Sequence, residues 1–357
     1  MTTQLSITQK AGTLKRHLEK ASSILLVTHK NCDHDAICSI LLLNYLIMNY
    51  FKKKVTAIVQ ERSWPRFASI HPPGLKNITC INPETPVDTK PYDLIIMADC
   101  SFLERAILTE ENMTAIENRL IIIDHHDVAP SHGFLQGVIM NCSSAAELIY
   151  RLFNELVPDI HTDIVVAELT QIGIIADTNR FMYAESISRQ TFEIMGELFE
   201  TNPINIERLY YDISKTTRNS IYIFDHIVQN LQFKDDMAYS FVDPEFLSRH
   251  NYAETDFDSA KTTFLQIYLR AIEGVNWGFL LYKSRAKDNW KVSFRSIAGT
   301  VPVVNFAQAL GGGGHTNAGS GTVEAETLED AIHQVLDVIE KTPHTIRDTT
   351  FQEPTPA

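Results

Sequence analysis

The sequence has little of what would indicate a secreted, membrane-spanning or disulfide-stabilised protein. Its five cysteines are odd in number and show no C-x-x-C spacing, a pattern typical of free thiols in a reducing cytosol. The longest apolar run, residues 36–51, contains Asn44 and Asn49 and is shorter than the roughly 20 residues that a membrane span needs. The first 20 residues are polar and lack the apolar core of a targeting segment. These absences predict a cytoplasmic protein without a membrane partner.

Basic residues are also scarce, because 31 Lys and Arg stand against 44 Asp and Glu, which gives a net charge of −13. A chain this acidic is not expected to bind long nucleic acid, since phosphate neutralisation needs a basic surface. A Walker-type glycine loop ending in GK[ST] is absent, so ATP use by that route is not supported. A small phosphorylated ligand remains compatible with the composition if the positive charge is local or comes from metal ions.

The chain does have the composition of an ordinary globular protein, and its 357 residues correspond to about two domains. Short runs that are apolar throughout alternate with helical stretches in the first half, which favours a parallel sheet with helices on both faces. We therefore predict an α/β domain over residues 1–205. The predicted strands are 24–28, 54–60, 94–98 and 120–123, and the predicted helices are 36–51, 110–118, 145–156 and 163–176.

The pattern changes in the second half. Residues 206–232 read as a helical connector, and residues 233–341 as a smaller, mixed α+β domain. The Thr- and Pro-rich residues 342–357 are predicted to be disordered. In the second domain the predicted strands are 237–242, 268–273, 277–283 and 290–295, and the predicted helices are 258–267 and 328–340.

Acidic and imidazole residues stand where three of the predicted strands and one predicted helix end. Parallel strands meet ligands at their carboxyl ends, so these side chains should gather at one edge of the sheet. They are His29, Asp33, Asp35, Asp99, Asp124, His125, His126 and Asp177.

Carboxylates gathered in this way repel one another unless some are protonated or cations are present. Two divalent ions would balance Asp33, Asp35, Asp99 and Asp177, with neutral imidazoles as further ligands. Mixed oxygen and nitrogen ligands suit manganese, and less specifically magnesium, zinc, iron or cobalt. Taken singly, each Asp is equally well a helix cap or turn residue, and the paired histidines a solvated surface pair. A metal site is favoured only because all of these residues stand together at the ends of predicted strands and helices.

The second domain carries one sharp feature, four glycines at 311–314 followed by His315. Glycines let backbone N–H groups approach an anion closely, although such a run is also common in a flexible turn. Arg295 ends a predicted strand and is either a surface charge or a bidentate phosphate ligand.

Six segments resemble the motifs of the DHH phosphoesterase superfamily and its associated C-terminal domain, and they are similar to the NrnA-like subgroup of oligoribonucleases and pAp phosphatases. The resemblance covers about residues 20–340. The segments are THKNCDHDAICS (28–39), MADCS (97–101), IDHHDVAP (123–130), ADTNRF (176–181), VSFRS (292–296) and GGGGHTNAGSG (311–321).

The resemblance implies a role for each matching residue. His29 and Asp33 would hold one metal ion, Asp35, His125 and Asp177 a second, and Asp99 both. Asp124 would orient a histidine, and His126 would contact the scissile phosphate or donate a proton. Substrate contacts are implied for Arg105, Ser144, Arg295, Gly313, Gly314 and His315, in a cleft between the domains. Two residues depart from the family pattern, His34 and Asn179, each standing where the family commonly has glycine.

The implied activity is hydrolysis of short phosphorylated oligoribonucleotides or dinucleotides (nanoRNA, pApA), of pAp, or of both, by water activated at two metal ions. Manganese is expected foremost, with magnesium, cobalt or iron as alternatives. The alternative functions are a cyclic-di-AMP phosphodiesterase, a hydrolase like the family-II pyrophosphatases and, in a different class, a nucleotide-binding module without hydrolysis. The expected partner is a short RNA or a nucleotide, and homodimerisation is left open.

Overall fold

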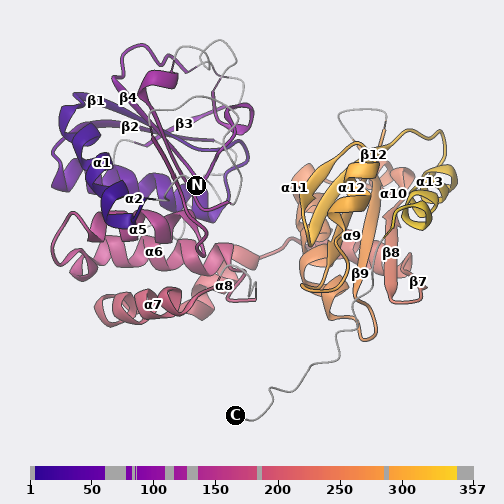
Figure 1. Cartoon of the computed structure of the whole chain (residues 1–357). Helices are drawn as coiled ribbons and strands as arrows, with labels where there is room; N and C mark the ends of the chain where they lie inside the picture. The colour runs from indigo at the N-terminus through magenta and orange to yellow at the C-terminus, as the bar shows by residue number, and fades with distance from the viewer. Residues whose placement is uncertain are drawn as a thin grey trace. The chain divides into compact units, whose positions relative to one another are not determined.

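The computed structural model describes residues 5–60, 78–82, 85, 87–108, 116–126, 136–182, 187–284 and 289–343. The chain divides into two compact units, Met1–Ser214 and Lys215–Ala357, which Figure 1 draws from indigo to pink and from pink to yellow. The division lies inside the connector expected at 206–232. No helix in the described part of the chain has both the length and the apolarity to cross a membrane.

The first unit is built on a sheet of six parallel strands in the order β3-β2-β1-β4-β5-β6. The four inner strands are those predicted, and nearly every residue in them is buried, as expected for a parallel sheet. The edge strands were not predicted. The strands are β1 (Ser23–Val27), β2 (Lys54–Gln60), β3 (Ile78–Ile81), β4 (Leu94–Ala98), β5 (Leu120–Asp124) and β6 (Gln136–Ile139).

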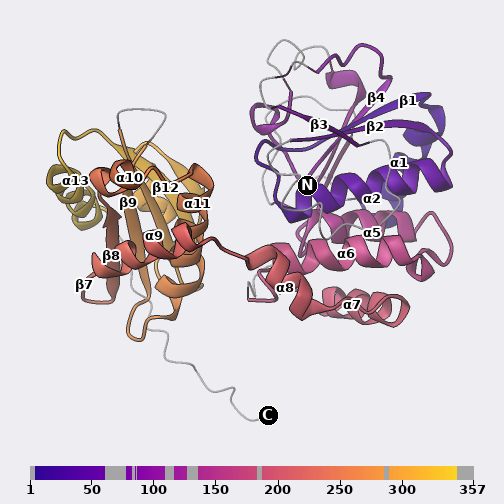
Figure 2. The ribbon, with the colours of Figure 1, turned by 180° about the vertical axis from the view of Figure 1, so that it is seen from behind.

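Helices pack against this sheet and against one another in layers, as Figures 1 and 2 show for α2, α5, α6 and α7. Helix α2 is buried along most of its length because the sheet lies on one side and α5 and α6 on the other. The helices are α1 (Ile7–Lys20), α2 (His34–Tyr50), α5 (Ala145–Asn154), α6 (Ile164–Asp177), α7 (Arg189–Thr201) and α8 (Ile206–Ser214).

The connection between β4 and β5 is described only at its ends, which form the short 3-10 turns η1 (Leu103–Arg105) and η2 (Glu117–Arg119). Most of the helix predicted at 110–118 therefore lies outside the described residues.

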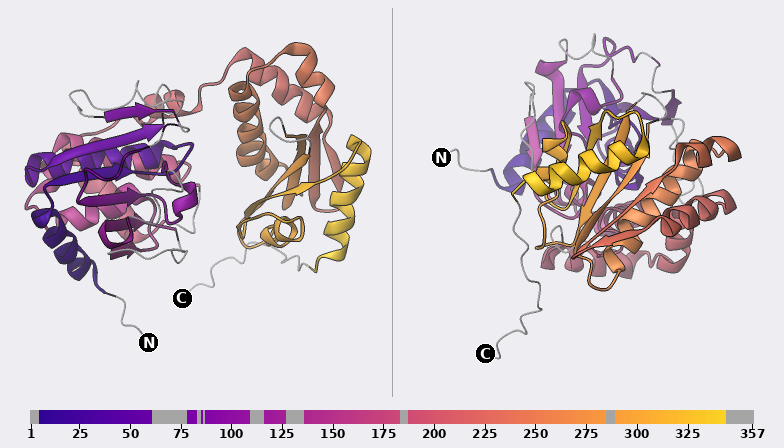
Figure 3. Two further views of the ribbon diagram at one scale, coloured as in Figure 1. Left: turned by 90° about the horizontal axis from the view of Figure 1, so that it is seen from above. Right: turned by 90° about the vertical axis from the view of Figure 1, so that its right-hand side faces the viewer.

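The second unit is a mixed sheet covered on both faces. All its strand pairs are antiparallel except β8 with β9. Figure 3 shows helices on both sides of it. The strand order is β11-β12-β10-β9-β8-β7, with β7 (Gln232–Lys234), β8 (Met237–Val242), β9 (Trp277–Lys283), β10 (Trp290–Ser296), β11 (Gly313–His315) and β12 (Ala318–Val323). The helices are α9 (Arg218–Gln229), α10 (Pro244–His250), α11 (Glu254–Thr263), α12 (Val304–Ala309) and α13 (Leu328–Lys341).

Alternate residues of β9 supply the two cores of this unit. Phe279 packs with residues of α12 and α13 on one face, whereas Leu280 packs with residues of α9 and α11 on the other. Both β9 and β10 follow their predicted ranges. The C-terminal tail predicted to be disordered lies almost wholly outside the described residues.

The strand predicted at 268–273 is wrong. Helix α11 instead continues through a π-helical turn, η5 (Phe264–Tyr268), into the 3-10 turn η6 (Leu269–Ala271). Leu265 and Leu269 are buried and Tyr268 is exposed. That spacing of four residues belongs to a helix face and not to the alternation of a strand.

The glycine run is required by the close approach of β11 to β12. Gly314 has φ +146°, and a Cβ atom there would lie 2.3 Å from the carbonyl oxygen of Ala318. We expect Gly314→Ala to lower the free energy of unfolding by about 2–4 kcal/mol, because both the backbone strain and the clash oppose it. Gly313→Ala is the matched control, since nothing lies within 4 Å of its Cβ position. Equal melting temperatures for the two variants would contradict this expectation.

Candidate metal centre

The strand order of the first unit places the loops after β1 and β4 next to each other. The chain leaves β1 toward β2 on one side, and leaves β4 toward β5 on the other. Ligands of open α/β sheets bind at such a reversal point. His29 follows β1 by two residues, and Asp99 follows β4 directly. Both predicted ligands therefore stand at the point where the topology favours a site.

The remaining predicted ligands come to the same place from the next elements. Asp33 is the N-cap of α2, where its side chain accepts a hydrogen bond from Ala36 N, and Asp35 lies in the first turn. His125 follows the last residue of β5, and Asp177 is the last residue of α6. The simple reading of Asp33 as a helix cap is thus also correct, and it does not exclude a ligand role.

Two groups of ligand atoms meet through Asp99. His29 Nε2 lies 3.5 Å from Asp99 Oδ2 and 4.0 Å from Asp33 Oδ2. His125 Nε2 lies 3.5 Å from Asp99 Oδ1 and 3.4 Å from Asp177 Oδ2. Asp35 joins His125 and Asp177 within 4.8 Å. The structure brings all six predicted ligands into one cluster, with one Asp99 oxygen facing each histidine.

Each histidine of the pair His29 and His125 turns its Nε2 atom toward the carboxylates. Nδ1 of His29 is 2.8 Å from the carbonyl oxygen of Lys30, and Nδ1 of His125 is 3.2 Å from that of Cys142. A carbonyl only accepts, so Nδ1 carries the proton and donates it. Once Nε2 has lost its proton, each ring presents an Nε2 lone pair, which is the form that binds a cation.

Asp124 orients His126, a histidine that is not one of the predicted metal ligands. Its Oδ1 atom accepts from His126 Nδ1 at 2.7 Å, and its Oδ2 atom accepts from Ser101 Oγ at 2.5 Å. The carboxylate raises the pKa of His126, although burial opposes this. Ser101 was not singled out from the sequence, and only its place in the MADCS segment could have indicated it.

Asp35 is held by a helix that no motif connected with it. Its two oxygens accept hydrogen bonds from Ala145 N at 2.7 Å and Ala146 N at 3.0 Å, at the N-terminus of α5. On α6, Gly173 leaves the space that this carboxylate occupies, because a Cβ atom there would lie 2.8 Å from Asp35 Oδ1. The side chain is therefore fixed by α5 and α6 as well as by its own helix.

The cluster disturbs the protonation of its own members. Burial opposes protonation of His29, yet Asp99 and Asp33 raise its pKa to about 9. Burial raises the pKa of Asp177 to about 7, with Asp99 adding to the effect and His125 opposing it. Burial and nearby carboxylates also raise the pKa of Asp35. Protons thus offset the negative charge where no cation does so.

The donor set fits a hard divalent cation on two observations. Asp99 Oδ1 and His125 Nε2 are buried and lie 3.5 Å apart, and neither forms a hydrogen bond of good geometry. Buried polar atoms of this kind are rare and indicate a missing partner. Carboxylate oxygens with imidazole nitrogens are also the ligands that manganese and related ions accept.

The structure describes all five cysteines, none of them in a disulfide. Three stand near the cluster and donate to backbone carbonyls, such as Cys100 to Phe102 at 3.2 Å and Cys142 to Ser144 at 3.3 Å. Burial raises the pKa of Cys100 to about 12 and that of Cys142 further. The thiols of Cys100 and Cys142 therefore stay protonated at neutral pH where no metal ion binds them.

The predicted substrate residues of the first unit differ in their surroundings. Arg105 ends η1, and its carbonyl accepts from Lys30 N at 2.7 Å, which ties it to the loop that carries His29. Ser144 is buried, and its Oγ atom caps α5 by accepting from Glu147 N. The structure thus gives Ser144 a capping role, and its substrate role stays a prediction.

In the second unit, Arg295 on β10 and His315 on β11 both pair with Ala318 of the intervening strand β12. The two positions therefore lie at one level of the sheet, with Gly313 and Gly314 beside them. The side chain of His315 lies outside the described residues. One departure from the family pattern also has a structural explanation, because Asn179 has φ +47°, where glycine is favoured.

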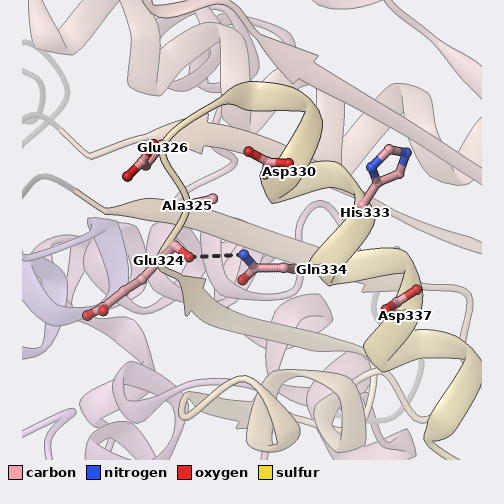
Figure 4. A pocket seen from close by; sticks show the side chains of 7 residues that line it. All are labelled: Glu324, Ala325, Glu326, Asp330, His333, Gln334 and Asp337. Atoms are coloured by element: carbon pink, nitrogen blue, oxygen red, sulfur yellow. Dashed lines mark hydrogen bonds between the residues drawn. The ribbon is translucent and has the colours of Figure 1, made fainter.

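Figure 4 shows a second cluster of carboxylates, which lies in the second unit. It lines a hollow of about 540 Å³ between the end of β12 and α13. The lining residues are Glu324, Ala325, Glu326, Asp330, His333, Gln334 and Asp337.

A parallel α/β unit that gathers carboxylates and imidazoles at the switch point of its sheet has the ligand types and the location of a metal-binding site. Two family models match the chain in order: "DHH family, N-terminal domain" at residues 23–174 and "DHHA1 domain" at residues 249–341. The chain belongs to the DHH superfamily and is NrnA-like. It is accordingly a phosphoric ester hydrolase.

Two curated relatives are bifunctional oligoribonuclease and PAP phosphatase NrnA proteins. That of Bacillus subtilis is 27% identical, covering 71% of this chain and 78% of its own. That of Thermus thermophilus is 26% identical, covering 88% and 89%. A solved exopolyphosphatase-related protein from Bacteroides fragilis matches with a TM-score of 0.78 at 23% identity, covering 96% of this chain and 98% of that one, and supports the fold.

Proposed function

We propose that this chain hydrolyses short phosphorylated oligoribonucleotides or dinucleotides, such as nanoRNA and pApA, or the nucleotide pAp, with two divalent metal ions. The observation that carries the proposal is the shared carboxylate of Asp99, whose two oxygens face His125 and His29 at 3.5 Å each. Such sharing is what a pair of cations requires. The printed activity of the NrnA relatives supports the choice of substrate.

Six residues would hold the ions in two sets joined by Asp99: His29 and Asp33 in one, and Asp35, His125 and Asp177 in the other. Divalent ions bound there would lower the pKa of water and offset the charge that develops on the phosphate. Manganese fits the ligand set, with magnesium, cobalt or iron as alternatives.

His126 is the proposed proton donor. Nδ1 donates to Asp124 and the ring is partly exposed, so Nε2 is the atom proposed to act on the substrate. The Asp124 carboxylate raises the pKa of His126, which favours the protonated ring, the form that can protonate a leaving oxygen. Asp124, itself fixed by Ser101, sets the orientation of the ring.

Substrate contacts are proposed for Arg105 on the first unit and for Arg295, Gly313, Gly314 and His315 on the second. The common register of Arg295 and His315 supports a joint role in holding one terminal nucleotide. A cyclic dinucleotide would offer no terminal phosphate to such a site, and for that reason we place cyclic-di-AMP second.

The decisive experiment is a hydrolysis assay of the full chain with Mn²⁺ on pAp, pApA, RNA of two to five nucleotides and cyclic-di-AMP. We expect turnover of the linear phosphorylated substrates, and a loss of turnover when the metal is chelated. A protein that binds Mn²⁺ but hydrolyses none of these compounds would contradict the proposal.

Metal binding should release protons. Below pH 9 His29 is mostly protonated, and below pH 7 Asp177 is as well, so a cation must displace these protons. The apparent Mn²⁺ affinity should therefore rise from pH 6 to pH 8, by about tenfold per pH unit for each proton displaced. Calorimetric titrations in buffers of different ionisation enthalpy measure the release directly. An affinity that does not change with pH would exclude these residues as ligands.

A further inference from the structure

The turn after α6 carries an arginine with unusual surroundings. Arg180 lies three residues beyond Asp177, and its N–H donates to the carbonyl of Ile175 at 2.8 Å, which holds the turn against the helix end. Asn179, Arg180 and Phe181 all have positive φ, between 47° and 63°. Three successive left-handed residues without glycine cost free energy, and such strain concentrates at functional sites.

The Arg180 guanidinium is held in place without a carboxylate. It donates to Asn179 Oδ1 at 2.5 Å and to Ser214 Oγ at 3.4 Å, and it lies 4.8 Å from the centroid of the Tyr210 ring. Within the described residues it forms no ion pair. Neighbouring Arg208 stacks on Tyr211 in a similar way but is neutralised by Asp212 at 2.8 Å.

A fixed guanidinium without an ion pair in the described part of the chain, carried three residues beyond the proposed ligand Asp177, has the chemistry of a phosphate ligand. A guanidinium has five N–H groups, of which three donate here to Asn179 and Ser214, so two are left to bind phosphate oxygens. The carboxylates of the centre would repel a phosphorylated substrate, so a cationic side chain would favour substrate binding here. The strained turn directs the side chain toward α8, where Ser214 and Tyr210 fix it.

We propose that Arg180 binds an anionic phosphate group of the substrate on the catalytic unit. This rests on the proposed function, because it assigns a binding residue to the same centre. Arg180 sets where the phosphate lies, and Tyr210, through its ring, is a positioning residue for Arg180.

The test uses the Mn²⁺-loaded full chain with inorganic phosphate as the probe. Phosphate binding is measured by calorimetry, and separately as competitive inhibition of pAp hydrolysis. We expect Arg180→Gln to weaken phosphate binding about 10- to 100-fold, because charge-assisted hydrogen bonds contribute a free energy of this size. The same variant should raise KM more than it lowers kcat. Arg180→Lys should be intermediate, since it keeps the charge without the guanidinium.

Arg189→Gln is the matched control, because it removes the same charge from an arginine whose side chain is 90% exposed on α7. Unchanged phosphate binding in Arg180→Gln, or an equal loss in Arg189→Gln, would overturn the inference and leave the proposed function intact. If Arg180→Gln does not fold, the same criterion is applied to Arg180→Lys. Phosphate binding that depends on Arg180 in a protein without hydrolysis would instead contradict the proposed function alone.

Discussion

Replacing Asp99 by asparagine should lower kcat/KM by about 10³-fold or more. Asp99 is the only residue that joins both groups of proposed ligands among the described residues, so its loss weakens both cation sites. Metal ions contribute several kcal/mol to such reactions, and each 1.36 kcal/mol is a factor of ten. Asparagine is the suitable replacement because position 99 has φ +53°, which Asn and Asp tolerate better than other residues do.

Asp159→Asn provides the control for this variant. Asp159 is also left-handed, with φ +56°, and lies exposed on the first unit away from the cluster. It should keep the activity and the Mn²⁺ stoichiometry of the unchanged protein. Measured activity of Asp99→Asn within tenfold of that of Asp159→Asn would remove Asp99 from the proposed centre.

Replacing Gly173 by alanine should disturb the proposed metal centre through the packing of α6 against Asp35. The added Cβ would lie 2.4 Å from Ala146 Cβ and 2.8 Å from Asp35 Oδ1. Both α5 and the Asp35 carboxylate must then move, although alanine favours the helix itself. We expect a loss of about 1–3 kcal/mol in the free energy of unfolding and a 10- to 100-fold loss of Mn²⁺ affinity.

Gly196→Ala tests the same substitution in a helix without the contact. Gly196 is exposed on α7, and nothing lies within 4 Å of its Cβ position. Thermal melts should show it stabilised by about 0.5–1 kcal/mol. If Gly173→Ala behaved like Gly196→Ala in stability and in metal titration, the packing of α6 against Asp35 would have no functional consequence.

The elements that could be predicted are those whose residues are buried on both sides. The inner strands β1, β2, β4 and β5 are nearly continuous apolar runs, and all four match. The edge strand β3 is partly exposed and carries no such run. Strand β12 reads AGSGTV because Gly319 must approach Ala307 of α12 and Gly321 must approach Leu310, the C-cap of that helix. That requirement exists only in the folded structure, so the sequence pattern did not indicate a strand.

The cluster itself followed from one rule, that parallel strands present ligands at their carboxyl ends. The parts that could not be predicted are backbone groups. The carbonyls of Lys30 and Cys142 orient the two imidazoles, and the amides of Ala145 and Ala146 hold Asp35. Every residue has these groups, so they leave no signature in the sequence. The resemblance implied that Asp124 orients a histidine, and the structure shows that this histidine is His126.

The distribution of the thiols makes the chain convenient for labelling. Four cysteines are buried, whereas Cys80 is exposed on the edge strand β3. A maleimide dye added at neutral pH should therefore attach to Cys80, on a strand that β2 separates from β1, the nearest strand that leads to a proposed ligand. Such a reporter would allow fluorescence measurements on the unmutated protein while its ligand side chains stay unmodified.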